Sequence, residues 1–180
     1  MEFTKTKISG LFLIQNDVFK DDRGFFVKSY QLDLFEKLGI KMDLEEQYFS
    51  ISKKSVIRGM HFQILPHAQN KLVSCTQGSV FDVVCDLRQN SPTYGKSESF
   101  ELSFENAKAL YIPKGLVHGF QATSEASTMY YQVSKMYSKQ HEQGICYDSL
   151  GIDWPLKPAI INERDRILPA LKEYKSPFYF

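Results

Sequence analysis

The chain has 180 residues, of which 43% are hydrophobic and 14% aromatic, enough apolar material for one buried core. Its 22 lysines and arginines nearly balance 21 aspartates and glutamates, and a net charge of +1 gives no general attraction to nucleic acid or to a membrane surface. We therefore expect a single domain over residues 1–180 that binds neither, so any anionic ligand must be held by a local cluster of positive groups.

The cysteines and the N-terminal residues both indicate a reducing compartment. Cys75, Cys85 and Cys146 are odd in number and lack CxxC spacing, which is typical of buried apolar side chains rather than disulfides or metal ligands. The first twenty residues contain only a short apolar run at 11–14, with no signal peptide or membrane span. We expect a cytoplasmic protein.

The first predicted element is a helix near the N-terminus. Ser29 can cap it, and Gly39 can end it. Its apolar positions follow helical spacing: Leu32, Leu34, Phe35 and Leu38.

The next element, residues 58–63, reads Arg-Gly-Met-His-Phe-Gln and is strand-like. In a regular strand Arg58 and His61 would point to opposite faces, because side chains alternate. A turn at Gly59 would break that alternation and let both side chains reach one cleft. Histidine is the side chain best placed to take a proton near neutral pH, and arginine is well shaped to hold phosphate oxygens. The segment indicates a base beside an anion clamp.

Most of the middle of the chain reads as short strands separated by turn-forming residues. The predicted strands are 72–75, 80–87, 97–102, 110–112 and 129–133. In the second of these, Phe81, Val83, Cys85 and Leu87 share one face, and Val80, Asp82, Val84 and Asp86 share the other. Short strands at this spacing predict a β-sandwich or barrel.

The last predicted element is a short helix over Asn162–Leu171, with Asn162 as its cap and Asp165 three residues later. The sequence thus predicts one all-β domain with a few short helices at its ends.

Several side chains on the later strands could join His61 in one site. Lys71 and His118 lie on or beside predicted strands, and Tyr130 and Tyr131 add phenols. In a small barrel such strands can converge on one mouth, so these groups could line a single cavity.

Each candidate also has an ordinary structural explanation. Lys71 could be a solvated lysine at a sheet edge, and Tyr131 could be a core residue. Asp165 fits an acid at the N-terminus of a helix, and Arg23 fits an exposed turn residue.

A series of ordered motifs runs through nearly the whole chain. They are Asp22–Phe26, Val56–Gln63, Pro66–Gln69, Lys71–Val73, Val80–Val83, Asp86–Arg88, Ser91–Thr93, Tyr111–Pro113, His118–Phe120 and Gly151–Pro155. Together they resemble the dTDP-4-dehydrorhamnose 3,5-epimerase family, a group of cupins that act on nucleotide-linked 4-keto sugars. The resemblance implies an all-β cupin jelly-roll sandwich or barrel with short peripheral helices. It also implies a cofactor-independent isomerase and a homodimer that exchanges N-terminal strands.

The resemblance further implies roles for single residues. His61 corresponds to the general base, and Asp165 to the carboxylate that orients it. Lys71 corresponds to the cation beside the developing enolate, and Tyr131 to the acid on the opposite face of the sugar. The groups implied for the diphosphate and the rest of the pocket are Arg23, Arg58 and His118.

The nucleotide end departs from the family pattern. Lys28 stands where members usually carry a glutamate, and Glu46-Gln47-Tyr48 stands where they usually carry Gln-Asp-Asn. Family members use these positions to recognise the base, so either the dTDP pocket has drifted here or the base differs. Because a carboxylate such as Glu46 can accept the paired N–H donors of guanine, the sequence slightly favours a GDP-linked 4-keto heptose or deoxy sugar, used for a bacterial capsular polysaccharide or lipopolysaccharide. The alternative is dTDP-4-dehydrorhamnose 3,5-epimerase activity proper.

Metal and cofactor chemistry are not expected. The segment after His61 reads Phe62-Gln63, so it lacks the second histidine of a metal-binding cupin, and His61 with His118 supplies too few ligands. Two other functions stay open: a 3,4-ketoisomerase of the same fold, and a non-catalytic cupin that only binds a sugar.

Overall fold

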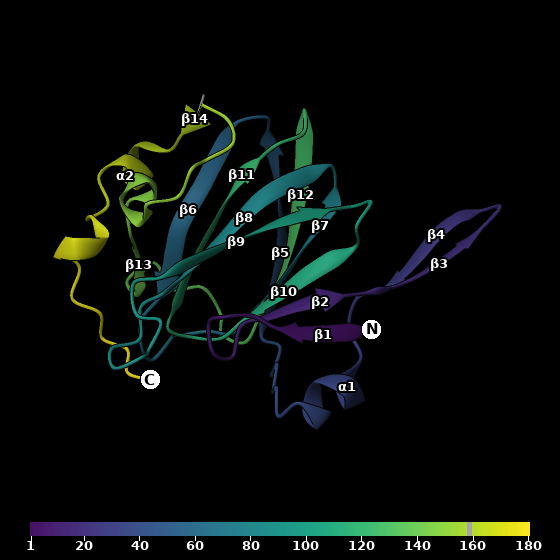
Figure 1. The fold of residues 1–180 in the computed structure, drawn as a ribbon, viewed down its shortest axis with the longest axis horizontal. Helices are drawn as coiled ribbons and strands as arrows, with labels where there is room; N and C mark the ends of the chain where they lie inside the picture. The colour runs from purple at the N-terminus through teal and green to yellow at the C-terminus, as the bar shows by residue number, and fades with distance from the viewer. Residues whose placement is uncertain (158–159) are drawn as a thin grey trace.

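The computed structural model describes residues 1–157 and 160–180, and two mainly antiparallel sheets face each other in it (Figure 1). The first sheet runs in the order β1 (Glu2–Lys5), β2 (Phe12–Gln15), β10 (Lys108–Ile112), β7 (Lys71–Gln77), β12 (Ala126–Val133) and β5 (Glu46–Lys53). The second runs in the order β13 (Glu142–Gly144), β6 (Val56–Gln63), β11 (Leu116–Ala122), β8 (Ser79–Asp86) and β9 (Ser97–Ser103), and β14 (Ile160–Ile161) pairs with β6. The chain therefore forms the cupin-type jelly-roll β-sandwich that the sequence predicts.

Each strand predicted in the middle of the chain is present, as β7 to β10 and β12. On β8 the predicted alternation holds: Val80 and Val84 lie in the core between the sheets, while Val83 and Cys85 lie in a second core on the outer side. The segment after β13 covers that outer side and contributes Phe178 to its core. Burial on both faces explains the nearly continuous apolar composition of β8.

The first helix, α1 (Leu32–Lys37), packs Phe35 against the outer face of the first sheet. Leu38 is its C-cap, and Gly39 adopts the left-handed conformation (φ +72°) expected after a helix. The predicted cap at Ser29 is wrong, because the N-cap is Gln31, whose side chain makes no capping hydrogen bond.

The second helix, α2 (Glu163–Arg166), is shorter than the predicted range of Asn162–Leu171. Asn162 caps it as predicted, and its side chain accepts a hydrogen bond from the backbone N–H of Arg164. Pro169 explains the early end, since a proline disfavours the helical conformation in the residue before it. Two short 3₁₀ turns, η1 (Tyr147–Leu150) and η2 (Leu171–Glu173), complete this region. Within the described residues, no helix is both long and apolar enough to cross a bilayer.

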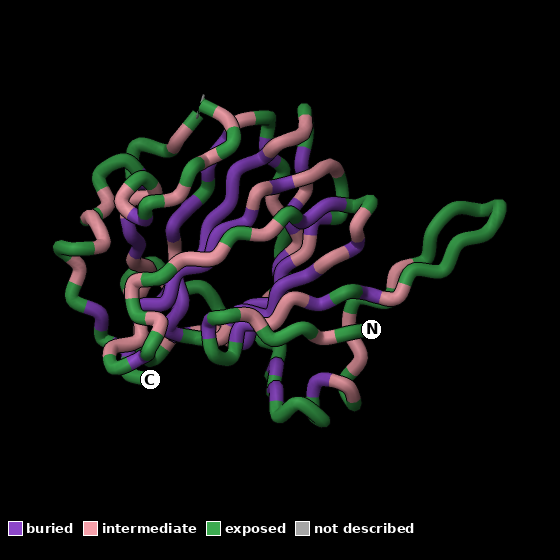
Figure 2. Tube along the Cα trace, viewed as in Figure 1, coloured by how far each residue is buried: buried purple, intermediate pink, exposed green. Residues whose placement is uncertain are grey.

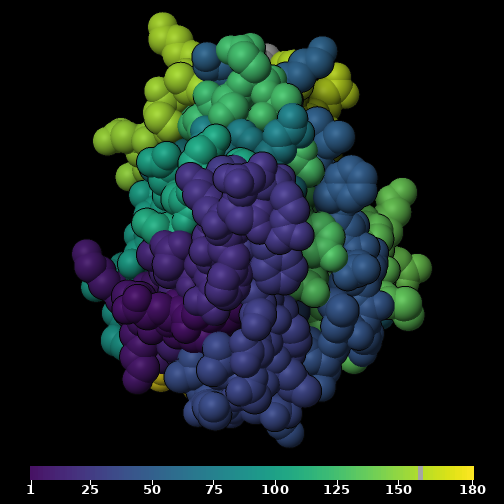
Figure 3. All heavy atoms as spheres, turned by 90° about the vertical axis from the view of Figure 1, so that its right-hand side faces the viewer, coloured from purple at the N-terminus to yellow at the C-terminus, as the bar shows by residue number. Residues whose placement is uncertain are grey.

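A hairpin of β3 (Asp17–Asp21) and β4 (Gly24–Lys28) projects from the sandwich and pairs with neither sheet (Figure 1). Nearly its whole length is exposed (Figure 2), and it stands forward of the body in the side view (Figure 3). Phe19, Phe25 and Phe26 are 56%, 51% and 63% exposed. Three large aromatic side chains exposed to solvent on one two-stranded ribbon are unusual for the surface of a monomeric protein.

Candidate active site

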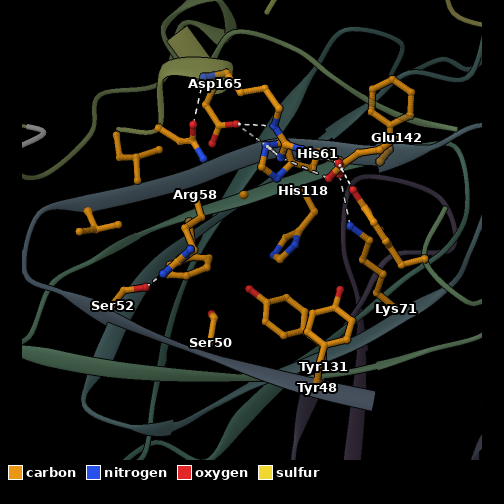
Figure 4. A pocket seen from close by; sticks show the side chains of 18 of the residues that line it. Tyr48, Ser50, Ser52, Arg58, His61, Lys71, His118, Tyr131, Glu142 and Asp165 are labelled. Atoms are coloured by element: carbon orange, nitrogen blue, oxygen red, sulfur yellow. Dashed lines mark hydrogen bonds and ion pairs between the residues drawn. The ribbon is translucent and has the colours of Figure 1, made fainter. Parts of the chain in front are cut away.

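A pocket of about 790 Å³ lies between the sheets and is lined by residues of β5, β6, β7, β11, β12, β13 and α2 (Figure 4). That volume suits a ligand of several rings. The pocket brings together most of the predicted site residues: His61, Lys71, Tyr131, Asp165, Arg58, His118, Glu46 and Tyr48.

Arg58 and His61 reach the same pocket because β6 has a bulge at Gly59. In the pairing with β11, His61 lies opposite His118 and Arg58 lies opposite Phe120, so two residues of β6 face one of β11. Gly59 has φ +130°, and a Cβ there would lie 2.6 Å from the Cα of Gly119. Only glycine fits this position, and the predicted break of alternation is confirmed.

His61 is joined to Asp165, which α2 carries to the pocket from outside the sandwich. Its Nε2 lies 2.7 Å from Asp165 Oδ1, and the backbone N–H of Gly59 donates to Asp165 Oδ2 at 3.4 Å. Burial alone would raise the pKa of Asp165, but these hydrogen bonds and the nearby charge of Arg164 hold the pKa below its ordinary value. An anionic Asp165 fixes the orientation of the imidazole ring and can compensate the positive charge that the ring gains if it accepts a proton.

A charged network that the sequence reading missed surrounds this pair. Arg164 Nη1 donates to Glu142 Oε2 at 2.5 Å, and its Nη2 lies 3.3 Å from His61 Nε2. The Tyr137 hydroxyl donates to the same Glu142 oxygen at 2.7 Å. Arg164 adjoins Asp165 in the chain and could have been flagged, whereas nothing local marks Glu142, which reaches the site only because β13 pairs with β6.

Lys71 lies in the pocket on the opposite sheet, on β7. It is buried, and its Nζ donates to the backbone carbonyl of His61 at 3.2 Å. Burial lowers the pKa of Lys71 to about 8, although the charges of Asp82 and Glu142 oppose that shift. The ammonium is therefore charged at neutral pH, with little water around it to screen the charge.

His118 forms a second histidine–aspartate pair, and its partner Asp82 was also missed. His118 Nε2 lies 2.8 Å from Asp82 Oδ2, and both side chains are buried. Burial raises the pKa of Asp82, against the opposing effects of His118 and Lys71. An aspartate on the core face of an apolar strand was a signal in the sequence, because a buried carboxylate needs a partner.

Tyr131 and Tyr48 stand side by side as cross-strand neighbours on β12 and β5. Their rings are stacked, with centroids 4.8 Å apart and planes at 19°. The ring of His118 meets Tyr131 edge-on at 6.3 Å. Burial raises the pKa of both phenols, and that of Tyr48 reaches about 12. Both phenols are therefore proton donors, not phenolates, at neutral pH.

Arg58 is held at the other end of the pocket by the edge strand β5. Its Nε donates to the Ser52 hydroxyl at 2.9 Å, and its Nη2 donates to the Ile51 carbonyl at 3.1 Å. These contacts fix the guanidinium and leave donors free for an anion.

The chain's own fold does not bring Arg23, Lys28 or Gln47 into this pocket. Arg23 lies at the turn of the hairpin, paired with Asp21, with its side chain 90% exposed. Lys28 ends the same hairpin and is exposed. The Gln47 side chain accepts a hydrogen bond from the Tyr130 hydroxyl and lies on the opposite face of β5 from Glu46 and Tyr48.

The pocket thus offers a base on one sheet and a phenol with an ammonium on the other, with a guanidinium at one end. A flat substrate between the sheets would meet His61 on one face and Tyr131 on the other (Figure 4). No group of three or more histidine, cysteine, aspartate or glutamate side chains suited to hold a metal occurs in residues 1–157 and 160–180.

Comparisons with known proteins agree over the whole fold. The sequence profile of the dTDP-4-dehydrorhamnose 3,5-epimerase family matches residues 5–173. The enzyme of that name from Shigella flexneri is 40% identical over 168 residues, which cover 92% of this chain and 93% of that protein.

Solved structures give the same result. A dTDP-6-deoxy-D-glucose-3,5-epimerase from Legionella pneumophila, in complex with dTDP-4-keto-L-rhamnose, is 36% identical with a TM-score of 0.94, and the match covers 99% of this chain and 98% of that one. A 3′-monoepimerase from Streptomyces bikiniensis, in complex with dTDP-quinovose, is 27% identical with a TM-score of 0.87, over 93% and 86% of the two chains.

Proposed function

The chain belongs to the dTDP-4-dehydrorhamnose 3,5-epimerase family, and from this premise we propose that its pocket inverts carbon 3, carbon 5 or both of a nucleotide-linked 4-keto sugar. The protein is an isomerase that acts on a nucleotide 4-keto sugar. One observation carries the assignment of roles: His61 and Tyr131 face one cavity from opposite sheets, with the Lys71 ammonium in the same cavity. Inversion requires a proton to leave from one face and return to the other.

The proposed reaction moves one proton off and another on. A 4-keto group acidifies the hydrogens on carbons 3 and 5. His61 takes one of them, and the C–H electrons form an enolate whose oxygen is stabilised by the preorganised charge of Lys71. The Tyr131 phenol then gives its proton to the opposite face of the carbon. Afterwards His61 releases its proton to solvent, and Tyr131 regains one.

For the nucleotide, we propose dTDP. The relatives are named for dTDP sugars, and two similar structures hold dTDP-linked ligands, which supports dTDP better than the GDP-linked sugar favoured on sequence grounds. The polysaccharide that uses the sugar stays a prediction. Calorimetric titration with dTDP, GDP, UDP and CDP tests the base, with tightest binding of dTDP expected. A clear preference for GDP would overturn this assignment.

We further propose that the active protein is a homodimer in which the β3–β4 hairpin reaches the partner. The exposed phenylalanines of the hairpin need a covering surface, and Arg23 at its turn lies outside its own chain's pocket. In a dimer Arg23 would supply a second guanidinium for the diphosphate. Lys28, at the end of the same hairpin, would approach the base only in such an assembly, and a role for Gln47 stays a prediction.

Subunit complementation tests the hairpin proposal. Arg23→Ala and His61→Asn variants, each weakly active alone, are co-expressed with different tags, and the hybrid is purified through both tags. Because one site of the hybrid combines an intact His61 with an intact Arg23, we expect about half of the wild-type activity per dimer. A hybrid no more active than its parents, or a monomer in sedimentation, contradicts the exchange.

The reaction itself is tested in deuterated water with a dTDP-linked 4-keto-6-deoxy sugar. We expect solvent deuterium at carbon 3, carbon 5 or both, with inversion seen by NMR. Movement of the keto group would indicate a 3,4-ketoisomerase instead. Binding without exchange at either carbon would indicate a non-catalytic cupin and would reject the proposal.

A further inference from the structure

The inner face of β5 presents hydroxyl and phenol groups in a row. Tyr48, Ser50 and Ser52 alternate along the strand and all line the pocket. Tyr48 stacks on Tyr131, and Ser52 holds Arg58. Ser50 stands between Ser52 and the two tyrosines (Figure 4).

Ser50 is conspicuous because its hydroxyl lacks a partner. Its Oγ is shielded from solvent and makes no hydrogen bond of ordinary geometry within the described chain. It is one of three buried side-chain N or O atoms without a hydrogen-bond partner among the described residues. A buried polar group without a partner costs free energy, so its retention needs an explanation. Because the Oγ is shielded from solvent, bulk water does not supply the missing hydrogen bond.

The neighbour that fits is the phenol of Tyr131. Ser50 lies opposite Met129 on β12, two residues from Tyr131 and on the same face, which makes the two side chains diagonal neighbours. Burial raises the pKa of Tyr131, and the nearby Ser50 hydroxyl opposes that rise. The remaining neighbours of this phenol include Asp82, whose charge disfavours a phenolate.

We propose that Ser50 is a positioning residue for Tyr131. The Ser50 hydroxyl donates a hydrogen bond to the phenolic oxygen of Tyr131 as that oxygen gives up its proton. The inference rests on the proposed epimerase function. When the Tyr131 O–H bond breaks and the new C–H bond forms on the sugar, the negative charge of the enolate passes to the phenolic oxygen. A hydroxyl with no other partner can turn towards that oxygen without losing a hydrogen bond elsewhere, so the donor is preorganised for the charged state.

The role predicts a specific defect. Without the Ser50 hydroxyl, His61 still removes the proton from carbon, but return from Tyr131 is slower. The enolate is then more often reprotonated by His61 on its original face. In deuterated water this yields deuterium in recovered, uninverted substrate, so the ratio of exchange to inversion rises.

The experiment compares Ser50→Thr with Ser50→Val, which have nearly the same shape and differ in the hydroxyl. We expect the Val variant to lose about 10- to 100-fold in kcat, with KM nearly unchanged and a raised ratio of exchange to inversion, as fits one hydrogen bond to a charged group. The Thr variant should keep most of the activity. Ser50→Ala provides a second hydroxyl-free variant, and thermal unfolding checks that each protein folds.

Ser97→Ala is the matched control, because Ser97 also has a buried, unpartnered hydroxyl but lies outside the pocket. It should leave kcat and the exchange ratio unchanged. Equal losses in the Thr and Val variants, or wild-type kcat in the Ala variant, would overturn the Ser50 assignment while the epimerase function stands. A wild-type protein that shows neither exchange nor inversion would overturn both.

Discussion

Two histidine–aspartate pairs of nearly equal geometry lie side by side in the pocket, and they differ in their surroundings. His61 and Asp165 are 2.7 Å apart, and His118 and Asp82 are 2.8 Å apart. The two histidines face each other across β6 and β11. Distance alone therefore cannot say which imidazole cycles protons.

The surroundings do distinguish the pairs. The His61 side chain is 25% exposed, so it can exchange protons with solvent, whereas that of His118 is 3% exposed. The pKa of Asp165 is lowered because hydrogen bonds and Arg164 outweigh burial, while burial raises the pKa of Asp82. An imidazolium is better stabilised beside a carboxylate whose pKa is lowered than beside one whose pKa is raised by burial. These differences support the proposal that His61 transfers the proton and that His118 has a buried, orienting role.

The largest expected effect comes from removing the proposed base. His61→Asn should lower kcat for epimerisation by about 10³- to 10⁴-fold, near the upper range of what a positioned general base contributes. The matched variant His118→Asn should lose at least tenfold less, because His118 only orients its neighbours. Steady-state kinetics on both variants measures the difference. Equal losses would erase the distinction between the two pairs.

The next effect tests the carboxylate behind the base. Asp165→Asn keeps the shape of the side chain but removes the charge that stabilises the His61 imidazolium, and we expect kcat to fall by about 10²-fold. KM should change little, because Asp165 lies behind His61 as seen from the substrate. A loss confined to KM would mean that Asp165 binds the sugar instead of orienting the base.

Alternation on the strands made much of the sandwich predictable. Val83 and Val84 fall on opposite faces of β8 as the sequence pattern requires, and Gly59 marked the one place where β6 departs from it. The ends of the helices were less accessible. The early end of α2 is consistent with Pro169, and α1 begins after Gln31, without a capping side chain, rather than after Ser29.

Only part of the site could be predicted from the sequence, because several of its residues depend on contacts between distant parts of the chain. The family motifs carry His61 and Lys71, but Glu142 enters the site through a strand pairing between residues distant in sequence. Asp82 acts through its contact with His118, and Ser50 is distinctive only because its hydroxyl lacks a partner in three dimensions. Arg23 lies outside its own chain's pocket, so the role proposed for it requires a second copy of the chain.

A smaller effect is expected from pH, through the buried Lys71. Because burial lowers the pKa of Lys71 to about 8, the ammonium that stabilises the enolate is lost as the pH rises through that value. We expect kcat/KM to fall about tenfold per unit well above pH 8, since kcat/KM reports groups of the free enzyme. Lys71→Arg should be slower but keep its activity at high pH, because a guanidinium stays charged. An alkaline limb unchanged in the Arg variant would exclude Lys71 as its source.

The smallest expected effect is a shift of the same alkaline limb of kcat/KM, which should distinguish Asp82 from Asp165. The charges that raise the pKa of Lys71 are those of Asp82 and Glu142. Asp82→Asn should therefore move the alkaline limb to lower pH, and Asp165→Asn should leave it in place. Because the amide oxygen introduced by Asp82→Asn can still accept a hydrogen bond from His118, we expect this variant to lose less than tenfold in kcat at neutral pH and about 1 kcal/mol in the free energy of unfolding.

The two variants therefore differ in what they change. Asp82→Asn should shift the pH of the alkaline limb, and Asp165→Asn should lower kcat without shifting it. Full pH profiles of both variants, with urea unfolding as the measure of stability, make the test. A limb that moved in Asp165→Asn but not in Asp82→Asn would contradict the coupling of Asp82 to the Lys71 ammonium. It would place Asp165 as the carboxylate that raises the pKa of Lys71, and the choice between His61 and His118 as the base would still rest on their own variants.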